Sequence, residues 1–355
     1  MKKFFQTIRK NKLYTALLIF IIGVNVLILF EKKPKELSVE QKISEAHSEK
    51  AKKSLFDEED IKLRQEKLQS LAVDNPILYL FLGILNLIML FLIFVGFVLD
   101  FYLIEHWIKK KPIRLLAVQT LSPEWHISDV FRVILIFVAF AYVVMILQSF
   151  TAHVFPLIDN NNFRMVFNTA VMNIVGISVI LYFVLKKYKQ DMSAIGFCLK
   201  KFFRNVFYGA AGYVALLPVL LLILLVTFFV TKFLGYKPPV QPIVRLFIEE
   251  KNTGVLWFSA LFAAVFGPFA EEIFFRGFMY PAARKKIGVF WAVISTSILF
   301  SVLHAHIVGF FPIIALSLLL TYLYERTGSL VSSITVHITH NVTMVFLVFL
   351  VRYIG

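Results

Sequence analysis

The side chains that could do chemistry gather near the carboxyl-terminal end of the chain. From residue 254 onward the acidic residues are only Glu271, Glu272 and Glu325. Glu271 and Glu272 are adjacent within an apolar stretch, where a carboxylate costs about 2.5–3.5 kcal/mol on insertion scales. Two adjacent carboxylates there need a cation or a shared proton, because each disfavours the charged form of the other. The doublet is therefore a candidate functional site.

A cation at helical spacing accompanies the doublet. Glu272 and Arg276 are four residues apart, the spacing at which their side chains meet on a helix. Glu271 points about 100° away from Glu272 and stays free to act as a base. A single Glu–Arg pair would be explained by a helix-end ion pair, but that explanation does not suit a doublet. Pro268 predicts a kink just before it, with loss of the helical bond to the carbonyl of Ala264.

Histidines recur on the two later apolar segments. They are His304, His306, His337 and His340. Phe300 lies four residues before His304, and Asn341 lies four residues after His337, so each pair shares a helix face. His340 lies near the second face, whereas His306 is turned by about 200° from His304. A single histidine here is usually a packing residue, but this combination predicts a site that uses glutamate and histidine.

Other hydrolytic sites fit the sequence less well. It has no His-Glu-x-x-His zinc motif, no Asp after Asp191 and no Gly-x-Ser-x-Gly nucleophile motif. Glu271, His304 and His337 could form the three-ligand set of a catalytic zinc with one open position. The same residues could work without metal. We favour the metal-free interpretation, because Asn341 is an unusual zinc ligand and a good oxyanion donor.

Composition places this site in a membrane. The chain is 59% hydrophobic and 17% charged, with a mean hydropathy of +0.78. Its apolar runs approach the roughly 20 residues that a helix needs to cross a bilayer. The sequence predicts an all-α, polytopic transmembrane bundle with about eight to nine spanning helices, of which 309–324 is the shortest. The predicted segments are 13–30, 76–103, 131–150, 166–185, 205–231, 254–279, 288–307, 309–324 and 330–351.

The same pattern divides the chain into four parts. Residues 1–30 are predicted to be an anchor helix, 31–75 a charged, partly helical extramembrane segment, 76–253 further membrane helices, and 254–351 a catalytic core. The net charge of +15 lies mainly in alternate connections between apolar runs. That distribution orients membrane helices and argues against nucleic-acid binding. It predicts a plasma membrane protein with a cytoplasmic amino terminus.

Three ordered motifs resemble the family of CAAX prenyl proteases and bacteriocin-processing membrane enzymes, which includes abortive-infection proteins. Glu-Glu-x-x-x-Arg is matched by residues 271–276, Phe-x-x-x-His by 300–304, and His-x-x-x-Asn by 337–341. The resemblance covers residues 266–345. It implies hydrolysis of a peptide bond in a membrane-associated protein or peptide, by an enzyme surrounded by lipid.

The resemblance also implies roles for individual residues. Glu271 and His304 would activate a water molecule, and His337 and Asn341 would stabilise the oxyanion. Glu272, Arg276 and Phe300 would support these four residues. Two alternatives stay open: a non-catalytic scaffold or immunity protein and, with less support, a proton-coupled transporter.

The charge pattern predicts that the connection Arg284-Lys285-Lys286 lies in the cytoplasm and that the nearby site opens there. Single cysteines at 284–286, in a Cys198-free background, should resist an impermeant thiol reagent in intact cells. A cysteine in the opposite connection, 232–253, should react. Labelling of 284–286 from outside would contradict the predicted orientation.

Overall fold

The fold is described from a computed structural model. It covers residues 12–31, 58–109, 123–151 and 160–354, apart from 237 and 239. These residues form helices and no strand, as the sequence predicts. The α-helices are α2 (Lys12–Glu31), α4 (Glu58–Asp74), α5 (Pro76–Ile108), α6 (Ile127–Thr151), α8 (Asn161–Leu181), α9 (Phe202–Phe233), α10 (Pro242–Glu249), α11 (Thr253–Leu261), α12 (Gly267–Glu272), α13 (Tyr280–Leu303), α14 (Phe310–Thr327) and α15 (Leu330–Ile354). A 3-10 turn, η2 (Met192–Ile195), and three π-helical segments, η1 (Tyr182–Lys187), η3 (Phe262–Phe266) and η4 (Ile273–Met279), join them.

Six stretches of the described residues are long and apolar enough to cross a membrane. They are Pro76–His106, Ile127–Gln148, Asn161–Lys187, Phe202–Phe233, Thr253–Leu303 and Leu330–Ile354. These stretches confirm a polytopic helical bundle. The predicted number of eight to nine spans stays a prediction, as do the four parts of the chain. Most of the predicted polar segment 31–75 lies outside the described residues, which include α4.

The stretch Thr253–Leu303 combines two predicted segments. Its 51 residues would extend roughly 75 Å at about 1.5 Å per residue, more than twice the bilayer core. Gly288 breaks it with a φ of 78°, a backbone conformation that glycine adopts without steric strain. The second predicted segment ended at residue 307, but α13 ends at Leu303.

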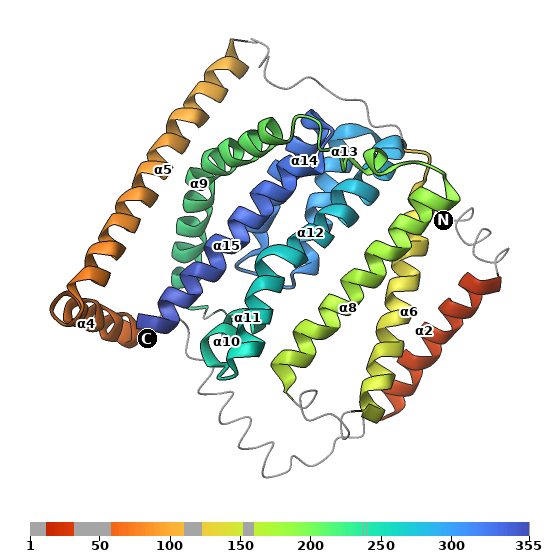
Figure 1. Cartoon of the computed structure of the whole chain (residues 1–355), viewed down its shortest axis with the longest axis horizontal. Helices are drawn as coiled ribbons and strands as arrows, with labels where there is room; N and C mark the ends of the chain where they lie inside the picture. The colour runs from red at the N-terminus through yellow and green to blue at the C-terminus, as the bar shows by residue number, and fades with distance from the viewer. Residues whose placement is uncertain are drawn as a thin grey trace.

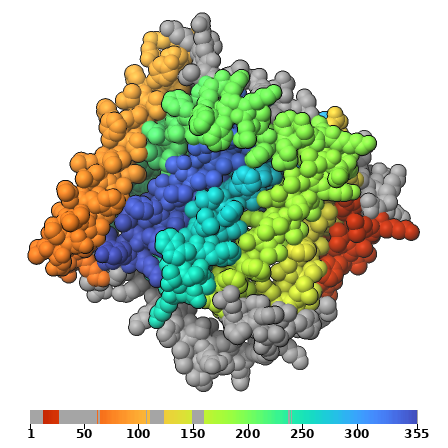
Figure 2. Space-filling model, viewed as in Figure 1, coloured from red at the N-terminus to blue at the C-terminus, as the bar shows by residue number. Residues whose placement is uncertain are grey.

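Five long helices and the short α12 lie side by side in Figure 1, in the order α9, α15, α12, α8, α6 and α2. Helix α5 stands at one edge and packs mainly against α9, while α2 packs against α6 at the other edge. Figure 2 shows the same order as coloured bands across this face. Helix α15 thus lies inside the bundle, between α9 and the short α12.

Polar contacts gather at the two ends of these helices. At one end Asp129 of α6 contacts Lys187, and Arg284 of α13 pairs with Glu325 of α14. At the other end of α8, the Glu250 carboxylate accepts hydrogen bonds from Asn160, Asn162 and the Asn252 N–H, while Arg352 of α15 donates to its backbone carbonyl. Burial alone would raise the pKa of Glu250, but these side-chain and backbone N–H bonds outweigh it and lower the pKa.

Helix α15, which carries His337 and Asn341, approaches α9 closely. A Cβ added at Gly209 of α9 would lie 2.6 Å from the Ser332 carbonyl oxygen and 2.7 Å from Thr335 Cβ. No side chain larger than glycine fits there without moving the α15 backbone. One face of α15 is thus held against α9, and α15 also packs against α12.

Candidate active site

The glutamate doublet ends a very short α-helix between two π-helical segments. Helix α12 has only six residues, Gly267–Glu272, and η3 and η4 flank it. π-helical turns are rare and often occur at functional sites, because the extra residue redirects the side chains that follow. Glu271 and Glu272 are therefore placed by an irregular backbone rather than by a uniform helix.

The irregular backbone changes the effect of Pro268. The Gly267 N–H donates to the carbonyl of Phe262, five residues earlier, so the N–H that Pro268 lacks would have faced Ala263. The Asn341 amide nitrogen donates to this Ala263 carbonyl at 2.9 Å. The carbonyl left without its helical donor is thus that of Ala263, rather than the predicted Ala264. Asn341 compensates for the proline and ties α15 to η3.

The ion pair predicted from helical spacing is present. Arg276 Nη1 lies 2.8 Å from Glu272 Oε1, with side-chain exposures of 1% and 0%. The second nitrogen, Nη2, donates to Ser317 Oγ at 2.6 Å, and its distance to the Ser317 carbonyl oxygen is 3.3 Å. The guanidinium carbon lies 4.5 Å from the centre of the Phe300 ring. Arg276 therefore joins α12 to α13 and α14.

His337 lies between the two glutamates. Its Nδ1 is 2.8 Å from Glu272 Oε1, and its Nε2 is 3.8 Å from Glu271 Oε2. His337 therefore forms a hydrogen bond with Glu272, whereas its distance to Glu271 is too long for one. The His337 side chain is 3% exposed, whereas that of Glu271 is 35% exposed. Glu271 is thus the accessible carboxylate and Glu272 the buried one, as their difference in direction predicts.

His304 occupies a more open position. It is exposed at the end of α13, and its Nδ1 lies 2.7 Å from the Phe300 carbonyl oxygen. Because a carbonyl only accepts, Nδ1 carries the proton in this contact and Nε2 is left free. No hydrogen bond or ion pair joins His304 to Glu271 in the part of the chain that the structure describes. The Phe300 ring packs against the rings of both histidines, at 4.7 Å from His304 and 5.7 Å from His337 between centroids.

The other two histidines have separate partners. His306 follows the end of α13, so its direction is not set by a helical turn from His304. Its Nδ1 accepts the Gly309 N–H at 2.9 Å before α14 begins. His340 packs against Tyr213 of α9, and its buried Nδ1 has no hydrogen-bond partner among the described residues. Neither histidine joins the Glu271–His337 pair.

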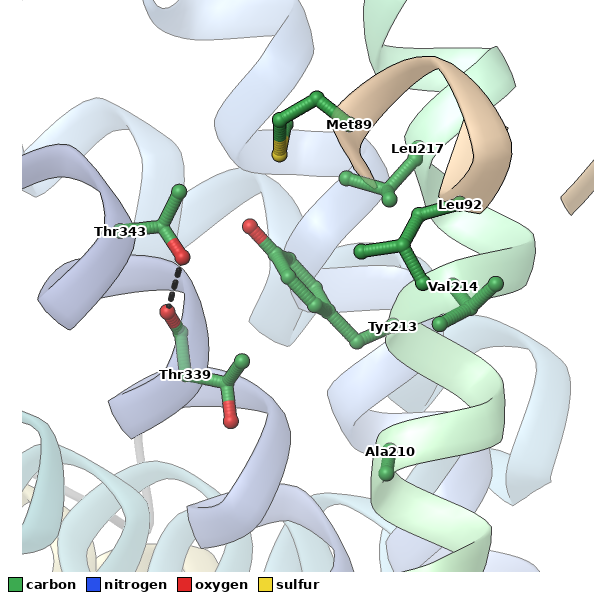
Figure 3. A pocket seen from close by; sticks show the side chains of 8 residues that line it. All are labelled: Met89, Leu92, Ala210, Tyr213, Val214, Leu217, Thr339 and Thr343. Atoms are coloured by element: carbon green, nitrogen blue, oxygen red, sulfur yellow. Dashed lines mark hydrogen bonds between the residues drawn. The ribbon is translucent and has the colours of Figure 1, made fainter. Parts of the chain in front are cut away.

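A cavity of about 190 Å³ lies behind the candidate site. Figure 3 shows it between α5, α9 and α15, with the Tyr213 ring pointing between Met89 and Thr343. Thr339 and Thr343, which also line it, are about 200° around α15 from His337 and Asn341. The cavity therefore belongs to the opposite face of the helix and includes none of the predicted site residues.

The three residues considered as zinc ligands do not come together as a metal site. Within the described ranges, no group of three or more His, Cys, Asp and Glu side chains could hold a metal ion. Glu271 and His337 are neighbours, but His304 is turned to the Phe300 carbonyl. This arrangement of the three side chains does not fit a three-ligand zinc site.

The fold and the buried charged site define a class: a polytopic membrane protein with a Glu–Arg–His cluster among its helices. Residues 253–343 match the family model described as type II CAAX prenyl endopeptidase Rce1-like. No curated protein and no solved structure matches the chain. The chain therefore carries a domain of the Rce1-like type II CAAX prenyl endopeptidase family, a family of membrane proteases. This match confirms the family resemblance, and its range includes every predicted site residue.

Breaking the buried ion pair should destabilise the protein more than removing both partners. Arg276→Ala removes the guanidinium that pairs with the buried Glu272 carboxylate, and breaking a buried ion pair in this way typically costs about 3–5 kcal/mol. The double variant Arg276→Ala/Glu272→Gln removes that charge and should recover part of the loss. Thermal unfolding in detergent measures both. Additive losses in the double variant would show that the two side chains are not coupled in the folded protein.

Proposed function

We propose that the chain is an intramembrane endopeptidase that hydrolyses a peptide bond of a membrane-associated protein or peptide. The observation that carries the proposal is the accessible Glu271 beside His337, whose other ring nitrogen is held by the buried Glu272–Arg276 pair. Glu271 is thus a base that substrate can reach, and His337 beside it is already held in one orientation by the Glu272–Arg276 pair. Such fixed groups stabilise developing charge more effectively than groups that must reorganise.

The proposed reaction begins with a water molecule between Glu271 and His304. Glu271 accepts a proton as the water oxygen attacks the carbonyl carbon of the scissile bond. The free Nε2 of His304 accepts a hydrogen bond from the same water. The absence of a direct Glu271–His304 contact is compatible with these roles, because a water can bridge the two and catalytic contacts often tighten only with substrate. Collapse of the tetrahedral intermediate breaks the C–N bond, and the proton returns to the leaving amine nitrogen.

His337 and Asn341 would stabilise the oxyanion. Because Glu272 accepts from Nδ1, Nε2 of His337 can donate to an oxyanion only when the ring is an imidazolium. In that form Arg276 and His337 balance the charges of the two glutamates. The Asn341 amide nitrogen uses one N–H on Ala263 and keeps a second for the oxyanion. Phe300 supports the site by packing against Arg276 and both histidines.

The side of the membrane on which the site opens stays a prediction. Glu271 lies 13 residues before Arg284, about 20 Å along a helix, which is most of the bilayer core. His304 lies at the end of α13 opposite to Arg284. A cytoplasmic 284–286 connection would therefore place the exposed His304 toward the opposite side of the membrane. The predicted plasma membrane location and cytoplasmic amino terminus do not depend on this point.

Glu271→Gln should abolish cleavage and leave the folded yield unchanged. The substitution keeps the size of an accessible side chain but removes the base. The probe is a quenched fluorescent peptide that ends in a farnesylated CAAX sequence, together with comparative proteomics of membranes. Glu249→Gln is a matched control, because Glu249 is exposed at the end of α10. Full cleavage by purified Glu271→Gln would exclude the assignment. No cleavage of the peptide by wild type, together with identical membrane proteomes for wild type and Glu271→Gln, would favour the scaffold or transporter alternatives.

Alanine substitutions at His304, His337 and Asn341 should lower kcat far more than alanine substitutions at His306 and His340. Alanine at Asn341 or His337 should lower kcat by about 100- to 1,000-fold, as for a lost oxyanion donor. Alanine at His304 should lower it by about 100- to 10,000-fold, as for a lost proton-transfer partner. His306→Ala and His340→Ala should be much milder, because neither side chain contacts the site. A loss at His340 as large as that at His337 would contradict these roles.

A further inference from the structure

Ser317 lies on α14, outside all three sequence motifs, yet it contacts the charged site directly. Its side chain is fully buried. Hydroxyls within helices usually bond to the carbonyl four residues earlier, as Thr321 and Thr327 do on the same helix. The Ser317 hydroxyl is instead 2.6 Å from Arg276 Nη2. No other described residue outside the motifs makes a hydrogen bond to the Arg276 guanidinium.

The contact restricts the direction of the whole guanidinium. The group is a planar, rigid fork, so fixing one nitrogen restricts the direction of the other. Ser317 holds Nη2 with both its hydroxyl and its carbonyl oxygen, while Nη1 faces Glu272 Oε1 at 2.8 Å. The Phe300 ring covers the guanidinium face at 4.5 Å. Without the Ser317 hydroxyl, the carbonyl contact at 3.3 Å is the remaining bond on that side.

Glu272 transmits this constraint to His337. A single oxygen, Oε1, accepts from both Arg276 Nη1 and His337 Nδ1, at 2.8 Å each. The other oxygen, Oε2, is buried and has no hydrogen bond of standard geometry among the described residues, although the Ser333 side chain also interacts with this carboxylate. A rotation of the carboxylate that follows a displaced Arg276 would therefore move the acceptor away from Nδ1. The opposite ring nitrogen of His337 faces Glu271 at 3.8 Å.

We propose that Ser317 is a positioning residue: its hydroxyl holds Arg276 and Glu272 so that His337 faces Glu271 and the substrate. The proposal rests on the proposed peptidase function. In metal sites, loss of a side chain that orients a ligating histidine typically lowers metal affinity or activity by about 10- to 100-fold, and we expect an effect of the same order here. Ser317→Ala should therefore lower kcat by about that factor. KM should change little, because the fully buried Ser317 side chain is not accessible to substrate.

The chain provides a matched control in Ser297 of α13. Its side chain is also fully buried, and its hydroxyl has no hydrogen-bond partner among the described residues. Ser297→Ala removes one buried hydroxyl, as Ser317→Ala does, but should leave kcat and KM unchanged. The assay uses the full-length protein and the farnesylated CAAX peptide. Equal kcat for wild type and Ser317→Ala would overturn the positioning role.

A second measurement does not depend on activity. Histidine ¹⁵N spectra of the full-length protein in detergent report the hydrogen bond at Nδ1, and the His337 signal is identified by its loss in His337→Ala. Ser317→Ala should shift that signal, whereas Ser297→Ala should not. A lower kcat in Ser317→Ala with an unshifted His337 signal would indicate a structural defect and overturn the proposal. No cleavage of any probe by wild type, with the Ser317-dependent shift intact, would overturn the peptidase function instead.

Discussion

The burial of Glu272 is the constraint on which the rest of the site depends. A carboxylate with no exposed surface is strongly unfavourable unless a cation and hydrogen bonds replace its water. Arg276 supplies the cation, but its own charge is equally buried and has to be held. Ser317 and the Phe300 ring complete its surroundings. Four helical elements, α12, η4, α13 and α14, are thereby fixed relative to one another before any catalytic group is considered.

The same constraint sets the position of α15. His337 binds the shared oxygen of Glu272, and Asn341, one turn further on, binds the carbonyl that Pro268 leaves without a donor. Two polar contacts one turn apart fix both the height and the rotation of the helix. On its other face, Gly209 lets the α9 backbone approach closely. The irregular backbone around the glutamate doublet and the two polar side chains of α15 are therefore held together by direct hydrogen bonds.

Much of this arrangement could be predicted from sequence, because side chains four residues apart on a helix stay neighbours, even though Arg276 lies in the π-helical η4. The Glu272–Arg276 pair, the free direction of Glu271 and the helical bundle all follow from periodicity. The prediction fails where the helix is irregular: the π register at η3 moves the unpaired carbonyl to Ala263, and α13 ends before His306. Ala305, with a φ of 49°, turns the chain away there. Ser317 gave no signal, because one serine in an apolar helix resembles any other.

The contacts of position 276 suit an arginine better than a lysine. The side chain must meet Glu272 in one direction and Ser317 in another, and present a flat face to Phe300. A lysine ammonium could pair with the carboxylate, but it has no second nitrogen in a fixed plane and no flat face for stacking. It would leave Ser317 unbonded and Glu272 free to rotate about a single contact. The orientation of His337 therefore depends on the shape of the guanidinium as much as on its charge.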